Sequence, residues 1–164
     1  MPTILLETII NAPIDRCYDL ARSIELHQDG AGKTKEKAIH GITSGLIDLG
    51  ESVTWRAKHF GIWQKLKVQI IETDRPKSFT DVMIKGTFKT MKHVHSFEAN
   101  GNTTIMTDNF TYESPLYVLG RLADRLFLKK YMTEFLIHKN EVFKEVLESK
   151  EWQKYLKTND DGQI

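Results

Sequence analysis

Hydrophobic and polar positions follow different periods along the chain, and the first stretch combines a strand with short helices. Residues 3–11 are rich in Ile, Leu and Thr, which is typical of a β-strand. Residues 12–15 (Ala-Pro-Ile-Asp) indicate the start of a helix, because Pro suits the first turn and an acid complements the helix dipole. Apolar spacing then predicts a short helix to about Arg22, resumed to His27. Residues 28–37 are polar, contain two glycines and predict a solvated loop.

The middle of the chain, residues 38–112, alternates between apolar and polar positions. In residues 53–59, for example, every second side chain is apolar or aromatic, with Thr, Arg and Lys between them. Short runs of this kind are separated by turn residues such as Asp-Arg-Pro at 74–76. The pattern predicts an antiparallel meander with one buried face and one solvent-exposed face.

The last third follows a helical period. Ser114 and Pro115 suit the cap and first turn of a helix, and apolar positions recur at helical spacing from Leu119 to Leu147. A helix of about 30 residues would be about 45 Å long, so it needs a wide surface such as a curved sheet to lie on. Residues 154–164, which include Asn-Asp-Asp-Gly at 159–162, are expected to form a flexible tail, which leaves one domain over residues 1–153.

Composition narrows the class of protein. The 164 residues include 23 Lys and Arg and 22 Asp and Glu, so the net charge of +1 does not favour a nucleic-acid partner. No apolar run approaches the ~18 residues of a membrane span, and we expect no membrane insertion. The single cysteine, Cys17, excludes an internal disulfide or a cysteine-based zinc site within one chain. The first residues do not resemble a secretory signal, so a cytoplasmic protein is expected.

The strongest turn signal is Asn100-Gly101. A two-residue turn centred there predicts facing pairs on two strands: Phe97 with Thr104, His95 with Met106, His93 with Asp108, and Met91 with Phe110. Both strands then agree on which face is buried, and a slip of one residue would break that agreement. The hairpin therefore places two histidines and an aspartate on an apolar face.

A second turn, at residues 86–88 (Gly-Thr-Phe), predicts that Asp81 faces His93. Asp81, His93 and Asp108 would then form a polar row across three strands. A buried carboxylate is costly unless it is paired, and a protonated histidine between two carboxylates offsets that cost. In order of preference, the row is interpreted as a structural network, a cluster that orients a ligand in a cavity, or a metal site, and a catalytic acid–base pair also remains possible.

Several motifs occur in a fixed order along the chain. They are residues 12–14 (API), 50–57 (GESVTWRA), 79–83 (FTDVM), 86–88 (GTF), 93–97 (HVHSF), 107–108 (TD), 112–116 (YESPL) and 120–124 (GRLAD). Together with the order of elements they resemble the START-like, or SRPBCC, superfamily of helix-grip proteins, over about residues 3–150. The resemblance is greatest to bacterial ligand-binding members, whose relatives include polyketide cyclase/dehydrase-like proteins. It implies an α+β fold with a curved antiparallel sheet of about seven strands around a long C-terminal helix, and two short helices after the first strand.

The resemblance also implies a cavity between the concave face of the sheet and the long helix. With the strand alternation, it predicts a ligand-binding wall of Trp55, Leu66, Met83, His93, His95, Phe97, Met106, Asp108, Phe110, Tyr112, Met132, Phe135 and Leu136. His93, His95, Asp108 and Asp81 are the candidate catalytic residues if the protein is an enzyme. Trp63 falls on the solvent-facing phase of its strand and is left outside the cavity.

Three functions fit the sequence. The favoured one is binding of an apolar or aromatic small molecule, lipid- or polyketide-like, because a wall of Met and aromatic residues with few polar groups is usual for such sites. The second is a cyclase- or dehydratase-type enzyme with His93 or His95 as general acid or base. The third is an interaction module whose long helix binds a partner. We expect no cofactor and no metal ion, and the sequence leaves the oligomeric state open.

Overall fold

A single antiparallel sheet forms the frame of the protein in the computed structural model, which describes residues 1–156. The strands lie in the order β1-β7-β6-β5-β4-β3-β2. Their bounds are β1 (Thr3–Ile10), β2 (Lys37–Gly41), β3 (Ser52–His59), β4 (Ile62–Asp74), β5 (Ser78–Lys85), β6 (Thr90–Asn100) and β7 (Thr103–Glu113). The predicted meander is thus confirmed, and β1 adds to its edge beside β7.

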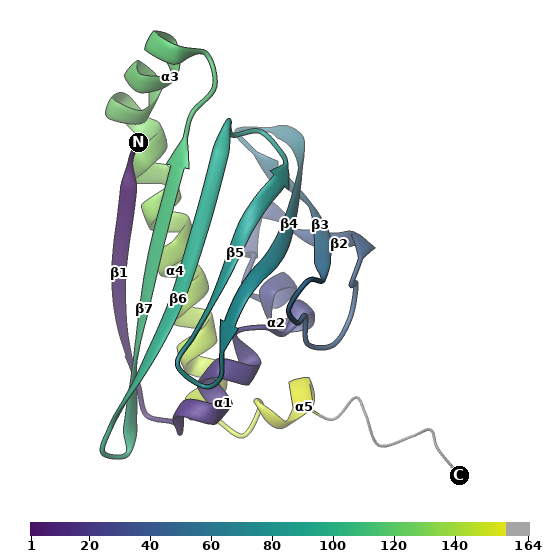
Figure 1. Cartoon of the computed structure of the whole chain (residues 1–164), viewed down its shortest axis with the longest axis vertical. Helices are drawn as coiled ribbons and strands as arrows, with labels where there is room; N and C mark the ends of the chain where they lie inside the picture. The colour runs from purple at the N-terminus through teal and green to yellow at the C-terminus, as the bar shows by residue number, and fades with distance from the viewer. Residues whose placement is uncertain (157–164) are drawn as a thin grey trace.

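Helices occupy the concave side and one end of this sheet (Figure 1). Between β1 and β2 lie α1 (Ile14–Leu20), α2 (Ile24–Asp29) and a 3₁₀ turn at Gly32–Thr34. After β7 come α3 (Tyr117–Ala123), a π-helical turn (Asp124–Leu128), α4 (Lys129–Glu148) and α5 (Gln153–Leu156). The predicted α+β helix-grip fold, with two short helices after the first strand, is confirmed. No helix among these is both long enough and apolar enough to cross a membrane.

The periods seen in the sequence explain how the two layers pack. In β3 and β7 every second side chain is buried, as for Val53 and Phe110. α4 buries one stripe at helical spacing, which includes Met132, Leu136 and Leu147. The ladder between β4 and β5 shifts register at two places, and such bulges bend and twist a strand. The bent sheet leaves a concave face into which the helix stripe packs.

The register of the β6–β7 hairpin corrects the prediction. Asn100 pairs with Thr103, so the turn residues are Gly101 and Asn102 rather than Asn100 and Gly101. Gly101 has a φ of +59°, which suits a glycine at the first central position of a type II′ turn. Every predicted pair is therefore displaced by two residues. Since side chains alternate with a period of two, the set of residues on the buried face is unchanged.

With the shifted register, His95 is opposite Asp108 and His93 is opposite Phe110. The predicted pairing of Asp81 with His93 across β5 and β6 is confirmed. The polar row therefore exists, but Asp81 and Asp108 are not paired with the same histidine: Asp81 is opposite His93, and Asp108 is opposite His95.

The C-terminal helical region is not the single helix that was predicted. It is divided by the π-helical turn at 124–128, and Leu116, which precedes α3, has a positive φ of 66°. The side chain of Asp124 is buried and accepts a hydrogen bond from Ser114 Oγ at 2.6 Å, which ties this turn back to the end of β7. Leu119, Leu122 and Leu126, predicted to belong to the packing stripe, are exposed because α3 lies beyond the sheet (Figure 1).

Two other predictions need smaller corrections. The loop predicted at 28–37 begins inside α2 and includes the 3₁₀ turn, in which Thr34 is buried and donates to the carbonyl oxygen of Ala31 at 2.8 Å. This local hydrogen bond replaces the solvation that the polar composition suggested. Of the tail expected at 154–164, residues 154–156 belong to α5, where Tyr155 donates to Asp29 at 2.7 Å. Residues 157–164 lie outside the described residues.

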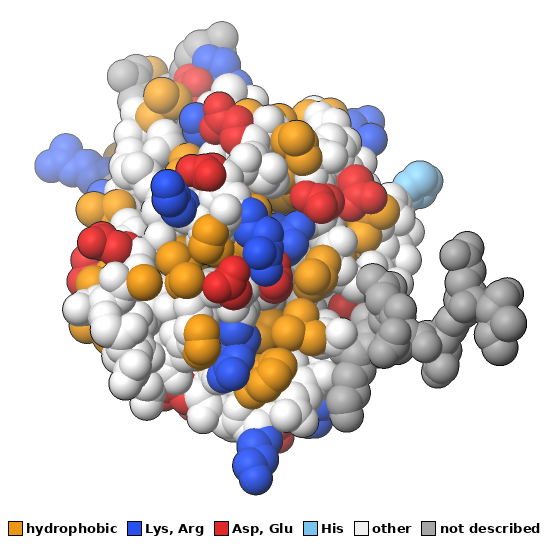
Figure 2. Space-filling model, turned by 60° about the horizontal axis from the view of Figure 1, so that its bottom comes forward, with side chains coloured by type: hydrophobic (Ala, Val, Ile, Leu, Met, Phe, Trp, Pro, Cys, Tyr) orange, Lys and Arg blue, Asp and Glu red, His pale blue; other side chains and the backbone are white. Residues whose placement is uncertain are grey.

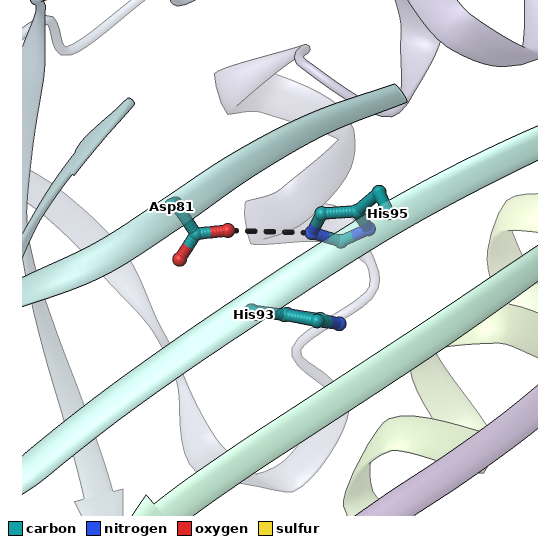
Figure 3. Close-up of side chains that lie close together, drawn as sticks. All are labelled: Asp81, His93 and His95. Atoms are coloured by element: carbon teal, nitrogen blue, oxygen red, sulfur yellow. Dashed lines mark ion pairs between the residues drawn. The ribbon is translucent and has the colours of Figure 1, made fainter. Parts of the chain in front are cut away.

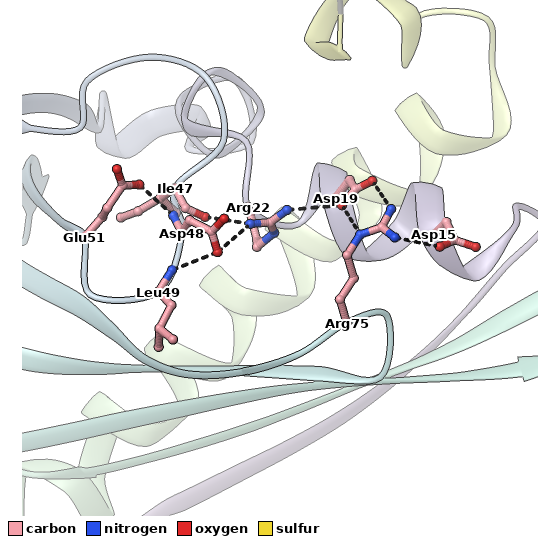
Figure 4. A network of polar contacts seen from close by, with 8 residues as sticks. All are labelled: Asp15, Asp19, Arg22, Ile47, Asp48, Leu49, Glu51 and Arg75. Carbon is pink, nitrogen blue, oxygen red and sulfur yellow. Dashed lines mark hydrogen bonds and ion pairs between the residues drawn. The ribbon is translucent and has the colours of Figure 1, made fainter.

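Salt bridges hold α1 against the loops at one end of the sheet (Figure 4). Arg75, in the β4–β5 turn, contacts Asp19 at 2.8 Å and Asp15 at 3.3 Å. The buried Arg22 also contacts Asp19, at 3.1 Å, and donates to the carbonyl oxygen of Ile47 at 3.1 Å. These contacts close the fold at the α1 end. The surface seen from that end mixes basic, acidic and apolar side chains (Figure 2).

Candidate functional site

A cavity of about 450 Å³ lies between the concave face of the sheet and the C-terminal helices. It extends from α1 and α2 at one end to α3 at the other. Its wall contains most of the residues predicted from the sequence: Trp55, Leu66, His93, His95, Met106, Asp108, Phe110, Met132, Phe135 and Leu136, with Asp81 among them. Strand alternation and helical spacing thus placed these side chains on the correct faces. Trp63 is half exposed and not among the lining residues, as expected.

Three predicted wall residues lie outside the cavity. Phe97 fills the core beneath α1, where it contacts Tyr18 with ring centroids 5.8 Å apart. Tyr112 is fully buried beside Phe88, with ring centroids 4.9 Å apart. Met83 lies near the end of β5, against Gly86. All three face the correct side of the sheet, but neighbouring elements cover them, and alternation alone does not reveal which inward positions are covered.

The polar groups of the wall form one cluster on three neighbouring strands, which we call the Asp–His cluster (Asp81, His93, His95 and Asp108). Asp108 Oδ1 is 3.0 Å from His93 Nε2 and 2.9 Å from His95 Nδ1. His95 Nε2 is 3.3 Å from Asp81 Oδ1 (Figure 3). With Asp108 on its Nδ1 side, this imidazole lies between two carboxylates. The His93 and His95 rings lie against each other, with centroids 3.8 Å apart.

The surroundings of the cluster decide its charges. Burial disfavours a charged His95, but hydrogen bonds to Asp108 and Asp81 outweigh it and raise the pKa of His95 to about 9. Burial also opposes the charge on Asp108, yet hydrogen bonds from His93 and His95 hold its pKa well below the ordinary value. The pKa of Asp81 is lowered against the cost of burial by its hydrogen bond from His95 and by the nearby His93. At neutral pH the cluster therefore contains an imidazolium and two carboxylates.

The helix side of the cavity supplies polar residues that the sequence analysis missed. Asn140, on α4, donates through Nδ2 to Asp108 Oδ2 at 2.7 Å and to Thr8 Oγ1 at 3.2 Å. Lys139 forms an ion pair with Glu36 at 2.6 Å, and both side chains are mostly buried. Asn140 follows Leu136 by four residues and Met132 by eight, so its helical spacing was a signal that it shares their face.

Two further histidines also line the cavity. His59 Nδ1 is 2.7 Å from the hydroxyl of Tyr131, and burial lowers the pKa of His59. His27 donates from Nε2 to the carbonyl oxygen of Ala21 at 2.9 Å. Burial, with the charges of Lys139 and His95 nearby, lowers the pKa of His27 to about 3. His27 is therefore neutral in the folded protein at pH 7.

The neutral His27 predicts an acid-sensitive fold. Its ordinary pKa in the unfolded chain is about 6.5. Below that value the unfolded chain takes up a proton that the folded protein does not bind, until the pH falls to about 3. We expect the free energy of unfolding to fall as the pH drops from 6.5 towards 4. The variant His27→Gln keeps a donor for the carbonyl oxygen of Ala21 but cannot take up the proton. We expect its free energy of unfolding to fall less over the same range. Urea titrations at several pH values measure the free energy of unfolding, and a substitution of the exposed His138, His138→Gln, is the control. An equal dependence of this free energy on pH in wild type and His27→Gln would contradict a neutral His27 in the folded protein.

The same cluster contains the residue types of a metal site. Asp81, His93 and His95 each offer one ligand atom, and these atoms lie within 4.8 Å of one another. However, both ring nitrogens of His95 already lie opposite carboxylate oxygens, which is the arrangement of a doubly hydrogen-bonded imidazolium. A metal ion would have to displace a proton from His95 and one of its carboxylate partners. The geometry therefore favours a proton over a metal ion.

Comparisons with known proteins bear on the fold. No family model matches the sequence, and no curated protein matches it. Among solved structures, TTHA0849 from Thermus thermophilus is 20% identical, with a TM-score of 0.74 over 89% of this chain and 97% of that chain.

Two further solved structures are similar over the same share of the chain. Ginseng major latex-like protein 151 from Panax ginseng is 16% identical with a TM-score of 0.65, and a START superfamily protein from Mycobacterium smegmatis is 12% identical with a TM-score of 0.67. Each match covers 89% of this chain and 97% of the other. Identities this low establish the shared architecture alone. The chain has the helix-grip fold of START-like proteins.

Proposed function

We propose that this protein binds an apolar or aromatic small molecule, lipid- or polyketide-like, in the cavity between the sheet and α4. The observation that carries the proposal is the cavity itself. Its volume of about 450 Å³ falls within the roughly 300–1,000 Å³ of small-molecule sites, and its wall is mostly Met, aliphatic and aromatic side chains with a smaller number of polar groups, the Asp–His cluster among them. A core built only for stability is close-packed, with few voids larger than a water molecule.

The Asp–His cluster selects the polar end of the ligand. The two carboxylates of the cluster, Asp81 and Asp108, outnumber its one imidazolium, His95. The Asp81 oxygen that does not face His95 points away from it and has no hydrogen-bond partner among the described residues (Figure 3). A carboxylate oxygen that lacks a donor in the protein can accept a hydrogen bond from a ligand. We therefore propose a ligand whose apolar body carries a hydrogen-bond donor, such as a hydroxyl group, rather than an anionic head.

Displacement of a neutral fluorescent probe, N-phenylnaphthylamine, tests both the binding of an apolar ligand and the preference for a hydrogen-bond donor over an anionic head. We expect the probe to bind, and dodecanol to displace it at least about tenfold more effectively than dodecanoate, because like charges about 4 Å apart repel by several kcal/mol in a partly dry site. Asp81→Asn should narrow this ratio, whereas the exposed control Asp15→Asn should not. Absence of probe binding would overturn the proposed function, and equal displacement by both amphiphiles would overturn the role of the cluster.

A second candidate function, acid–base catalysis of the cyclase or dehydratase type, rests on one observation. His93 and His95 both border the cavity, and His95 is a cation at neutral pH, which suits a general acid. A dehydration would lower the mass of the bound molecule by one water. Mass spectrometry of a molecule released from the protein before and after incubation separates the two functions. A carrier returns its ligand with an unchanged mass, whereas an enzyme returns a product. If the mass does change, His93→Gln should abolish that change.

A further inference from the structure

The end of the cavity near α3 is surrounded by exposed apolar side chains. Residues 116–127, which comprise Leu116 and the helical turns that follow it, project beyond the ends of β6 and β7 (Figure 1). Six large apolar side chains of this segment are between 49% and 72% exposed: Leu116, Val118, Leu119, Leu122, Leu126 and Phe127. We call these six residues the mouth patch. Single exposed apolar residues are ordinary, but a cluster of this size marks an interaction site.

The mouth patch is continuous with the cavity wall. Leu116, Leu119 and Phe127 line the cavity and are also exposed to solvent. Phe60 in the β3–β4 turn also lines the cavity, is half exposed and contacts Phe127, with ring centroids 5.7 Å apart. The exposed apolar surface of this segment is therefore continuous with the apolar wall of the cavity.

The exposure is built into the fold. The hydrogen bond from Ser114 Oγ to Asp124 anchors the π-helical turn to the end of β7. A Cβ atom at Gly120 would collide with the carbonyl oxygen of Pro115, so the backbone of α3 packs closely against the segment that leads into it from β7. The apolar side chains of α3 are thereby held outward.

Charge near the mouth patch is predominantly basic. Residues 115–133 contain four basic residues and one acidic residue, and the acidic residue, Asp124, is buried. Arg125, Lys129 and Lys130 are exposed. Lys130 lies 3.9 Å from Glu134, but an ion pair between two exposed side chains contributes little to stability. At the α1 end, by contrast, basic and acidic side chains intermingle (Figure 2). Large apolar side chains beside exposed lysine and arginine are the composition of helices that lie in the surface of an anionic bilayer.

We propose that the mouth patch docks on an anionic phospholipid surface, with Leu and Phe side chains in the interfacial layer and Arg125, Lys129 and Lys130 near the lipid phosphates. Leu116, Leu119 and Phe127 of the patch also line the cavity, so docking brings the cavity wall against the bilayer and shortens the path of an apolar ligand between the two. Ligand passage rests on the proposed function, whereas docking stands on the surface alone.

Flotation with vesicles tests the docking. Wild type is expected to float with phosphatidylcholine vesicles that contain a third of phosphatidylglycerol, and to float less with phosphatidylcholine alone or at high salt. The double variant Val118→Glu, Leu126→Glu is expected to lose affinity for the anionic vesicles by at least about tenfold, because two apolar anchors become charges that the lipid repels. Neither residue lines the cavity, so uptake of N-phenylnaphthylamine without vesicles should be unchanged.

The matched control is Leu5→Glu on β1, which is as exposed as the two patch residues and lies outside the helical segment. It should float like wild type. Docking is overturned if wild type does not float with anionic vesicles, or if the double variant floats as well as Leu5→Glu. It is also overturned if size-exclusion chromatography shows a wild-type dimer that the double variant abolishes, because the patch is then covered by a second copy. Flotation without probe uptake would retain docking and reject the proposed function.

Discussion

Asp108→Ala is expected to lower the free energy of unfolding by about 3–5 kcal/mol at pH 7, the usual cost of removing one partner from a buried ion pair. Asp108 Oδ1 accepts from both His93 and His95, and Oδ2 accepts from Asn140. The variant leaves these three groups without their shared acceptor, and His95 keeps only Asp81. Urea unfolding followed by circular dichroism measures the loss.

Two control variants show whether the loss of stability is specific to the buried contacts of Asp108 or follows from removing any aspartate. Asp108→Asn keeps an acceptor and should be less destabilising than Asp108→Ala. Asp15→Ala removes an exposed carboxylate that faces Arg75, so it should cost less than about 1 kcal/mol. If Asp108→Ala cost no more than Asp15→Ala, the cluster would contribute little to folding.

The pH dependence of Asp108→Ala should also change, on the alkaline side. His95 has a folded pKa of about 9, above its ordinary value of about 6.5, so its contribution is complete below pH 6.5 and is lost as the pH rises through 9. Wild type should therefore lose stability between pH 6.5 and 9, and the variant, in which His95 lacks one carboxylate, should lose less over the same range.

Ala57→Phe is expected to reduce the affinity for N-phenylnaphthylamine by at least about tenfold, because the new ring occupies space that the ligand needs. Ala57 is buried on β3 and lines the cavity. Since the ring enters a void rather than a filled core, the fold should survive at a cost below about 3 kcal/mol. Fluorescence titration gives the affinity, and thermal unfolding checks the fold.

The control for this variant is Ala99→Phe, which adds the same ring at an exposed position of β6. It should bind the probe like wild type. If Ala57→Phe also bound like wild type, the probe would occupy another surface and the cavity would not be the binding site.

The polar row shows how far local sequence rules reach. The turn at 86–88 predicted the pairing of Asp81 with His93 correctly, whereas Asn100-Gly101 was misplaced by one residue and shifted every β6–β7 pair by two. The predicted register placed Asp108 opposite His93, whereas the structure places it opposite His95, and in both registers these residues lie on the concave face. The face of a strand residue depends on parity, which a shift of two preserves.

The predictions for the C-terminal helices contain larger errors, because a helical pattern is local and the packing of a helix is not. Helical spacing placed Met132 and Leu136 on the cavity correctly, but it also predicted that Leu119, Leu122 and Leu126 pack against the sheet. Periodicity shows that a helix has an apolar face and does not show what that face meets. The sheet ends before α3 begins, so the same pattern that builds the core along α4 produces the exposed mouth patch.

By itself, the sequence determined the order of elements, the alternation that divides the sheet into two faces, and the residue types that gather on the concave one. These properties depend on neighbours one to four positions apart, which the chain specifies locally. Only the tertiary structure decided that Phe97 and Tyr112 are covered, that Asn140 reaches Asp108, and that His95 rather than His93 lies between two carboxylates. Those outcomes depend on how far α4 stands from the curved sheet and where each strand ends, and these distances are set by the packing of side chains far apart in the sequence.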